Sequence, residues 1–111
     1  MDWIVHICSK NEWRAAEQDG EYRAASLEDE GFIHCSRPEQ ILDVANQFYA
    51  GVPDLVLLCI DPQQLDAELL WETVEEEVFP HLYGPINLSA VKSVQSFIPD
   101  VDGTFQQLPE C

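Results

Sequence analysis

The sequence has few basic residues and no long apolar run, and each shortage excludes a class of function. Its 111 residues include only five lysines and arginines against 21 aspartates and glutamates, giving a formal net charge of -16. Nucleic-acid binding depends on basic side chains that neutralise phosphates, so this balance disfavours nucleic acid and anionic membrane surfaces as partners. No segment approaches the roughly 20 apolar residues of a membrane span, and the first residues lack the features of a signal peptide. We therefore expect a cytoplasmic location.

The four cysteines also lack a recognisable spacing. No Cys-x-x-Cys motif is present, and two of the four lie in apolar runs. This pattern favours buried free thiols in a reducing compartment. A zinc site built from His6, Cys8, His34 and His81 is the alternative, but no recognised ligand spacing supports it. We therefore predict no metal.

Composition and length indicate a folded protein. Hydrophobic residues make up 46% of the chain and aromatic residues 10%, whereas disorder requires low hydrophobicity together with high net charge. A chain of this length matches the usual size of one domain, so we treat residues 1–111 as a single domain. Self-repulsion at this charge favours solubility without excluding a dimer made through an apolar patch, and we expect a monomer or a weak dimer.

The hydrophobic pattern predicts a small α+β fold. Residues 55–60 form the longest apolar run, which is typical of a central strand. Ser9 and Glu12 have capping-box spacing before a short helix. Residues 79–86 contain too many prolines and glycines for regular structure. In chain order we predict strands at 3–8, 32–35, 55–60, 68–75 and 91–98, helices at 10–17, 27–30 and 37–50, and a loop at 79–86.

Three histidines are candidates for a shared site. His6 lies in the first predicted strand, His34 in the second and His81 in the loop at 79–86. Imidazole titrates near neutral pH and can both donate and accept a proton, so converging histidines suit acid–base chemistry or ligand orientation. Strand alternation places His34 and Ser36 on one face, where they could point at a cleft. For each histidine taken singly, a hydrogen-bonded core position is the alternative.

Ser36 and Arg37 precede the predicted helix at 37–50. Ser36 and Glu39 repeat the capping-box spacing, with Pro38 in the first turn. The start of a helix presents free N–H groups and a positive dipole end, which together with Arg37 would suit an anion. Plain helix capping is the alternative. Since four of the five basic residues lie at or before Arg37, we expect an anionic ligand at this end of the chain.

Glu72 and the segment 79–86 supply the remaining candidates. Glu72 would share a strand face with apolar neighbours, and a carboxylate in such a setting has a raised pKa suited to proton transfer. A solvated Glu72 on an edge strand is the alternative. The prolines and glycine of 79–86 fix a loop that displays Phe79, His81 and Tyr83, as in many small-molecule sites. A purely structural turn is the alternative here.

Several motifs together resemble one bacterial family. They are Glu30-Gly-Phe-Ile-His-Cys-Ser36, Ala45-Asn-x-Phe-Tyr-x-Gly51, Asp54-Leu-Val-Leu-Leu-x-Ile-Asp61, Glu72 and Phe79-Pro-His-Leu-Tyr-Gly-Pro-Ile86. Over nearly its whole length the chain resembles the family called domain of unknown function 952. That family looks like a compact relative of the ADP-ribosyltransferase fold, a split, mixed and mostly antiparallel sheet with two or three helices around a dinucleotide-binding cleft.

The same resemblance extends to tRNA 2'-phosphotransferases, which consume NAD. It implies that His6 contacts the ribose on the nicotinamide side and that His34 and Ser36 line the same cleft. Glu72 is a candidate for the catalytic glutamate of the transferases. NAD is therefore a candidate ligand by resemblance only, and an RNA substrate fits poorly with a charge of -16.

Our sequence-based hypothesis is a histidine-lined cleft that binds NAD, ADP-ribose or another anionic small molecule, with transferase or hydrolase chemistry. The expected catalytic residues are His6, His34 and Glu72, and the expected ligand-binding residues are Ser36, Arg37, His81 and Tyr83. The alternative is a non-catalytic ligand-binding or protein-interaction module that keeps the fold without the activity.

Overall fold

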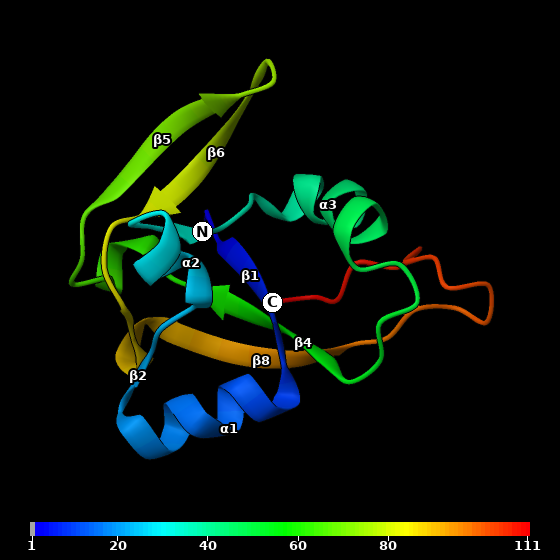
Figure 1. Ribbon diagram of the computed structural model, residues 1–111, viewed down its shortest axis with the longest axis horizontal. Helices are drawn as coiled ribbons and strands as arrows, with labels where there is room; N and C mark the ends of the chain where they lie inside the picture. The colour runs from blue at the N-terminus through cyan, green and yellow to red at the C-terminus, as the bar shows by residue number, and fades with distance from the viewer. Residues whose placement is uncertain (1) are drawn as a thin grey trace.

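The computed structural model describes residues 2–111, which form three α-helices and eight strands (Figure 1). In chain order the elements are β1 (Ile4–Ser9), α1 (Lys10–Asp19), β2 (Glu21–Tyr22), α2 (Ala25–Asp29), β3 (Ile33–His34), α3 (Ile41–Phe48), β4 (Leu55–Ile60), β5 (Leu69–Val74), β6 (Glu77–Leu82), β7 (Ile86–Asn87) and β8 (Val91–Phe97). Short 3-10 turns occupy Pro38–Gln40, Pro62–Gln64 and Leu88–Ala90. No helix within residues 2–111 is long and apolar enough to cross a membrane.

The strands form three small sheets, ordered β1-β4-β8, β3-β6-β5 and β2-β7. Every strand pair among the described residues is antiparallel, so the α+β class is confirmed, but the expected mixed sheet is not found. Val5 and Ser36 exchange backbone hydrogen bonds of 2.8 and 2.9 Å, which joins the edge of β1 to the chain just after β3. The two larger sheets therefore meet at this bridge.

Strand β4 is the centre of the molecule. All six of its side chains are buried, because both of its faces are covered. Val56, Leu58 and Ile60 pack into one hydrophobic cluster, and Leu55 and Leu57 pack into another. The long apolar run of the sequence is thus explained by a strand that supplies alternate residues to two cores.

The first helix begins and ends as its sequence predicts. The Ser9 hydroxyl accepts a hydrogen bond from the Glu12 N–H at 3.0 Å, and the Glu12 carboxylate accepts from the Ser9 N–H at 2.8 Å. This reciprocal capping box gives hydrogen-bond partners to two backbone N–H groups that have no partner within the helix. Gly20 ends α1 with a φ of 87°, a left-handed conformation that favours glycine.

The predicted helix at 37–50 starts differently. Ser36 is not its cap, because the first turn begins at Pro38 and Ser36 pairs with Val5 of β1 instead. Arg37 takes the cap position of a 3-10 turn, where its N–H donates to the Gln40 side chain at 2.9 Å. The α-helix itself, α3, begins only at Ile41. The predicted capping box was therefore wrong at this end.

The predicted loop at 79–86 was also wrong, because its first half is strand β6. Pro80 lies inside this strand, opposite Trp71 of β5, and its carbonyl accepts from the Cys35 N–H at 3.1 Å. The N–H and C=O of a strand residue point to the same side of the strand. Pro80 therefore lacks its N–H on the side that faces Cys35, which follows His34, the last paired residue of β3. A proline is tolerated where a ladder ends.

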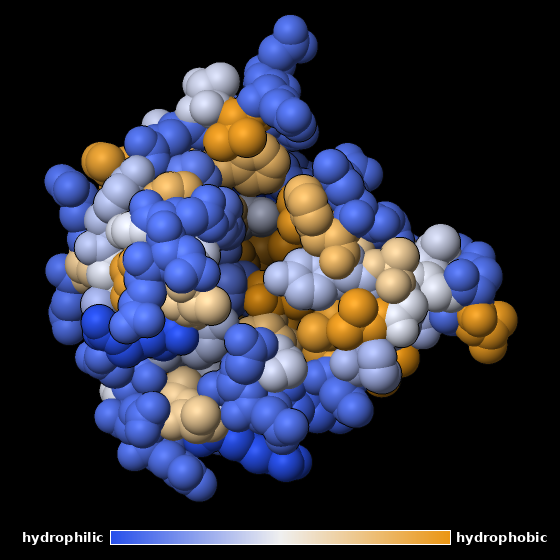
Figure 2. Space-filling view, in the orientation of Figure 1, coloured by the Kyte–Doolittle hydropathy of each residue, from blue (hydrophilic) through white to orange (hydrophobic). Residues whose placement is uncertain are grey.

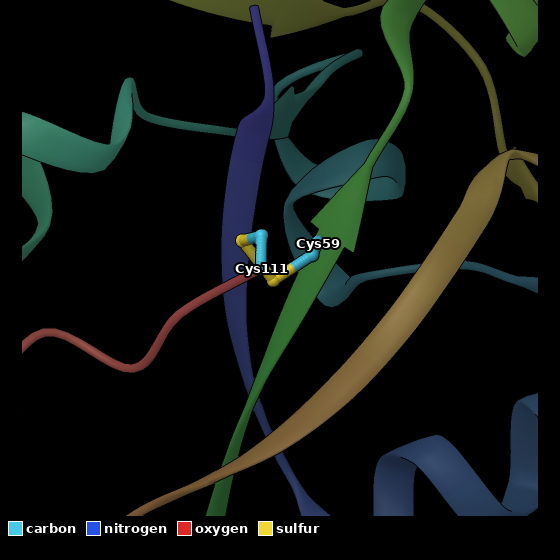
Figure 3. Close-up of a disulfide and its surroundings, with 2 residues drawn as sticks. All are labelled: Cys59 and Cys111. Atoms are coloured by element: carbon cyan, nitrogen blue, oxygen red, sulfur yellow. A yellow bond between two sulfur atoms is a disulfide. The ribbon is translucent and has the colours of Figure 1, made fainter. Parts of the chain in front are cut away.

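The cysteines are only in part the free thiols that the sequence predicted. Cys59 of β4 and Cys111 form a disulfide across 52 residues, with their Cα atoms 5.6 Å apart (Figure 3). Figure 3 shows the C-terminal segment reaching β4 beside β1. Cys8 and Cys35 are free and buried, and burial raises the pKa of each to about 12, so both stay protonated.

Candidate functional site

A cleft of about 730 Å³ opens along the outer edge of β1. Its walls come from α2 and the chain up to Ser36, from α3, and from the hairpin β5–β6. Figure 2 shows this hollow between α2 on one side and α3 on the other, with apolar surface in its depth (compare Figure 1). Five aromatic residues line it, namely Tyr22, Phe32, Phe48, Tyr49 and Phe79.

His6 lies in the cleft wall, but both of its ring nitrogens have protein partners. Its Nδ1 donates to the backbone carbonyl of His34 at 2.6 Å, because a carbonyl can only accept. The Tyr22 hydroxyl donates to His6 Nε2 at 2.9 Å. Burial lowers the pKa of His6, which keeps the ring neutral and fits this arrangement. His6 would have to give up one of these bonds in order to move a proton.

Phe32 packs against both of the other histidines, His34 and His81. Its ring stacks on His81 with the centroids 4.2 Å apart, and it packs against His34 at 4.7 Å. The His34 and His81 rings meet edge to face at 5.5 Å, since the two residues are paired across β3 and β6. His34 Nε2 and the Glu30 carboxylate are 2.9 Å apart at the surface. The three predicted histidines therefore lie around one cleft.

Glu72 lies outside the cleft lining and accepts a hydrogen bond from His81. Its Oε1 lies 2.8 Å from His81 Nδ1 and 2.5 Å from the Tyr83 hydroxyl, which both donate to it. These two hydrogen bonds, the one from Tyr83 first, lower the pKa of Glu72, so the raised pKa expected from its apolar neighbours was wrong. The bond to Glu72 in turn raises the pKa of Tyr83.

The charged side chains that line the cleft within residues 2–111 are acidic. They are Glu12 and Glu30, and no lysine or arginine of these residues lines it. Arg37 lies instead in a separate depression of about 400 Å³ beside Trp3 and Trp71. The structure therefore does not bring the predicted anion-binding arginine to the histidines.

The predicted site residues fall into three groups. His6, His34, Ser36 and His81 line the cleft. Glu72 and Tyr83 lie outside its lining and reach it through His81. Arg37 is elsewhere. Among residues 2–111, no group of three or more histidine, cysteine or acidic side chains is arranged to hold a metal ion.

Sequence reasoning missed the residues that shape the cleft. Phe32, which stacks on His81, lies two residues before His34 and so shares its face in an extended chain. That alternation was the available signal. Tyr22 and Glu12 gave no such signal, because their nearness to His6 depends on how α1 and the chain after it return to β1.

Comparison with known proteins identifies the family. The sequence model of the family described as protein of unknown function (DUF952) matches residues 7–94. The chain belongs to this family. The DUF952 protein is similar to protein CC0527 of Caulobacter crescentus, whose crystal structure has 36% sequence identity and a TM-score of 0.86, covering 94% of this chain and 93% of that one.

Two further structures of CC0527 support the same fold. The crystal structure of a double mutant has 35% identity and a TM-score of 0.86, with coverage of 94% of this chain and 93% of that one. The solution NMR structure has 36% identity and a TM-score of 0.82, with coverage of 96% and 93%. No curated protein matches the sequence.

Proposed function

We propose that this DUF952 protein binds a small nucleoside-like molecule in the histidine-lined cleft and that His81 moves a proton on it. The observation that carries the proposal is the setting of His81. Its side chain is only 6% exposed, its Nδ1 is held by Glu72, and it lines the cleft. Within residues 2–111 no hydrogen bond reaches its Nε2, which leaves a lone pair for a ligand.

The chemistry follows from these contacts. Because His81 Nδ1–H donates a hydrogen bond to Glu72, the neutral ring has its basic electron pair on Nε2. A ligand O–H or N–H at that position can transfer its proton to Nε2, and the resulting imidazolium is stabilised by the Glu72 carboxylate. Tyr83 donates a second hydrogen bond to Glu72 and so favours its ionised form. Glu72 and Tyr83 are positioning residues in this scheme.

A transferase or hydrolase reaction on a nucleotide is the finer part of the proposal. The resemblance to ADP-ribosyltransferases favours NAD or ADP-ribose, and the aromatic walls suit a planar base. The lack of a basic residue in the cleft wall favours ligands without a diphosphate. Nucleosides therefore belong in the test beside the two dinucleotide-like ligands.

Calorimetric titration of adenosine, NAD and ADP-ribose tests binding, and chromatography of free nicotinamide tests turnover of NAD. We expect binding of at least one ligand, and weaker turnover in Glu72→Gln and Tyr83→Phe with a changed pH profile. Glu76→Gln is the matched control, since Glu76 is exposed in the turn between β5 and β6. Absence of heat with all three ligands would remove the nucleoside-like proposal.

The second candidate is a non-catalytic module. The cleft favours it because no basic side chain among the described residues that line it would hold the diphosphate of NAD in place for a reaction. Binding without release of nicotinamide from NAD would support it. Release that depends on Glu72 but not on Glu76 would contradict it.

A further inference from the structure

Two of the three cleft imidazoles, those of His34 and His81, have a ring nitrogen to which no hydrogen bond is made within residues 2–111. His34 Nε2 donates to the Glu30 carboxylate at 2.9 Å, so in the neutral ring Nδ1 is the acceptor. The same reasoning leaves the Nε2 of His81 as an acceptor, on a side chain that is more than nine-tenths buried. A ligand that donates hydrogen bonds would therefore satisfy both of these ring nitrogens.

The carboxylates add acceptors and negative charge. Glu12 and Glu30 belong to the cleft wall, from α1 and from the chain after α2. Glu12 and Tyr49 line the same cleft, and burial, together with the Glu12 charge, raises the pKa of Tyr49. No lysine or arginine among the lining residues offsets these charges.

The aromatic walls favour the same kind of ligand. Phe32, Phe48 and Phe79 present rings to the cleft, and the face of an aromatic ring attracts a cation. Phe48 is 68% exposed at the rim, an unusual position for a large apolar side chain. The net charge of -16 surrounds the cleft with a negative potential that raises the local concentration of cations.

We propose that the cleft selects a small organic cation that donates hydrogen bonds, such as an amidinium or ammonium group on an apolar body. This inference rests on the part of the proposed function in which the cleft binds a small molecule, and it goes beyond the nucleosides proposed there by naming a second class of ligand. The donor group would lie at the ring nitrogens of His34 and His81, with the apolar body against the phenylalanines.

The test compares benzamidinium, benzamide and benzoate, which share one ring and a planar head group but are positive, neutral and negative. Each is titrated into the whole protein, labelled with ¹⁵N, and followed by the shifts of backbone amides in the cleft wall. At low salt we expect benzamidinium to bind about tenfold more tightly than benzamide, and benzoate to bind most weakly. Added salt should reduce the difference.

Glu12→Gln is the variant of choice. Glutamine keeps the side-chain oxygen that accepts the Ser9 N–H, so the capping box remains while the charge is lost. We expect the affinity for benzamidinium to fall about threefold and that for benzamide to stay unchanged. Glu17→Gln is the control, because Glu17 is exposed on α1 outside the cleft wall.

The outcomes separate the two proposals. Equal binding of benzamidinium and benzamide, or tightest binding of benzoate, overturns the cation preference but leaves the cleft as a ligand site. An equal loss of affinity for benzamidinium in Glu12→Gln and Glu17→Gln also overturns the cation preference. The charge of Glu12 in the cleft wall would then contribute no more to binding than the charge of Glu17 outside it. If none of the three probes shifts a cleft amide, the cation preference is wrong, while the nucleoside-like ligand is still decided by the titrations of adenosine, NAD and ADP-ribose.

Discussion

Strands β4 and β6 are both central in three-stranded sheets, but they differ in what they leave free. Every side chain of β4 is buried between two hydrophobic clusters. Strand β6 runs from exposed Glu77 to buried Leu82, and it carries His81 with one ring nitrogen unpartnered at the cleft. Strand β4 thus serves packing alone, whereas β6 carries a group that can still bind a ligand.

The largest effect that separates the two sheets is expected from truncation of a leucine. Leu58→Ala leaves a cavity in the centre of β4, and we expect the free energy of unfolding to fall by about 2 to 5 kcal/mol. Leu70→Ala on β5 is the matched control, because Leu70 is 40% exposed. Urea unfolding monitored by tryptophan fluorescence measures both. Similar losses would contradict the contrast between the sheets.

Removing the disulfide tests how far the scaffold depends on the C-terminal segment. Cys111→Ala breaks the bond to Cys59 without altering the buried strand, since Cys111 is exposed. A crosslink across 52 residues restricts the unfolded chain, so we expect a loss of about 2 to 4 kcal/mol. Dithiothreitol should lower the stability of the wild type to that of Cys111→Ala. An unchanged midpoint under reduction would show that the disulfide does not form in solution.

The sequence predicted the scaffold better than the site. The run at 55–60 and the capping box at Ser9 reflect local patterns, and both lie where they were expected. Strand β6 was missed because the tolerance of Pro80 depends on where β3 ends, which is a tertiary feature. The pairing of Cys59 with Cys111 and the bond between His6 and Tyr22 join residues far apart in the chain, so no local pattern could show them.

A smaller effect should appear in the pH dependence of stability through His6. Burial lowers the pKa of folded His6 below its ordinary value of 6.5, so below pH 6.5 the unfolded chain binds more protons. Stability from this group is therefore complete above pH 6.5 and is lost as the pH falls, by at most about 1.4 kcal/mol per unit. Comparing urea unfolding of wild type and His6→Gln at pH 7.5 and 5.5 isolates the group from the carboxylates. If the difference in free energy of unfolding between wild type and His6→Gln is the same at both pH values, His6 does not cause this pH dependence.

The smallest change in stability is expected from Tyr83→Phe. The Tyr83 hydroxyl donates to Glu72 at the surface, so its loss should leave the midpoint of urea unfolding nearly unchanged. It should nevertheless raise the pKa of Glu72 toward its ordinary value, because that bond is the largest cause of the lowering. Carboxyl ¹³C NMR during a pH titration measures this. An unchanged Glu72 titration would show that Tyr83 does not support the site.

The ring nitrogens of the histidines give the most direct test of the difference between scaffold and site. Long-range ¹H–¹⁵N correlation spectra at pH 7.5 distinguish protonated from unprotonated ring nitrogens, before and after addition of benzamidinium. We predict that the Nε2 of His81 and the Nδ1 of His34 are unprotonated and that their ¹⁵N chemical shifts change when the ligand is added. The ¹⁵N chemical shifts of both His6 nitrogens should not change. A ligand-dependent shift at His6 with none at His81 would contradict the account.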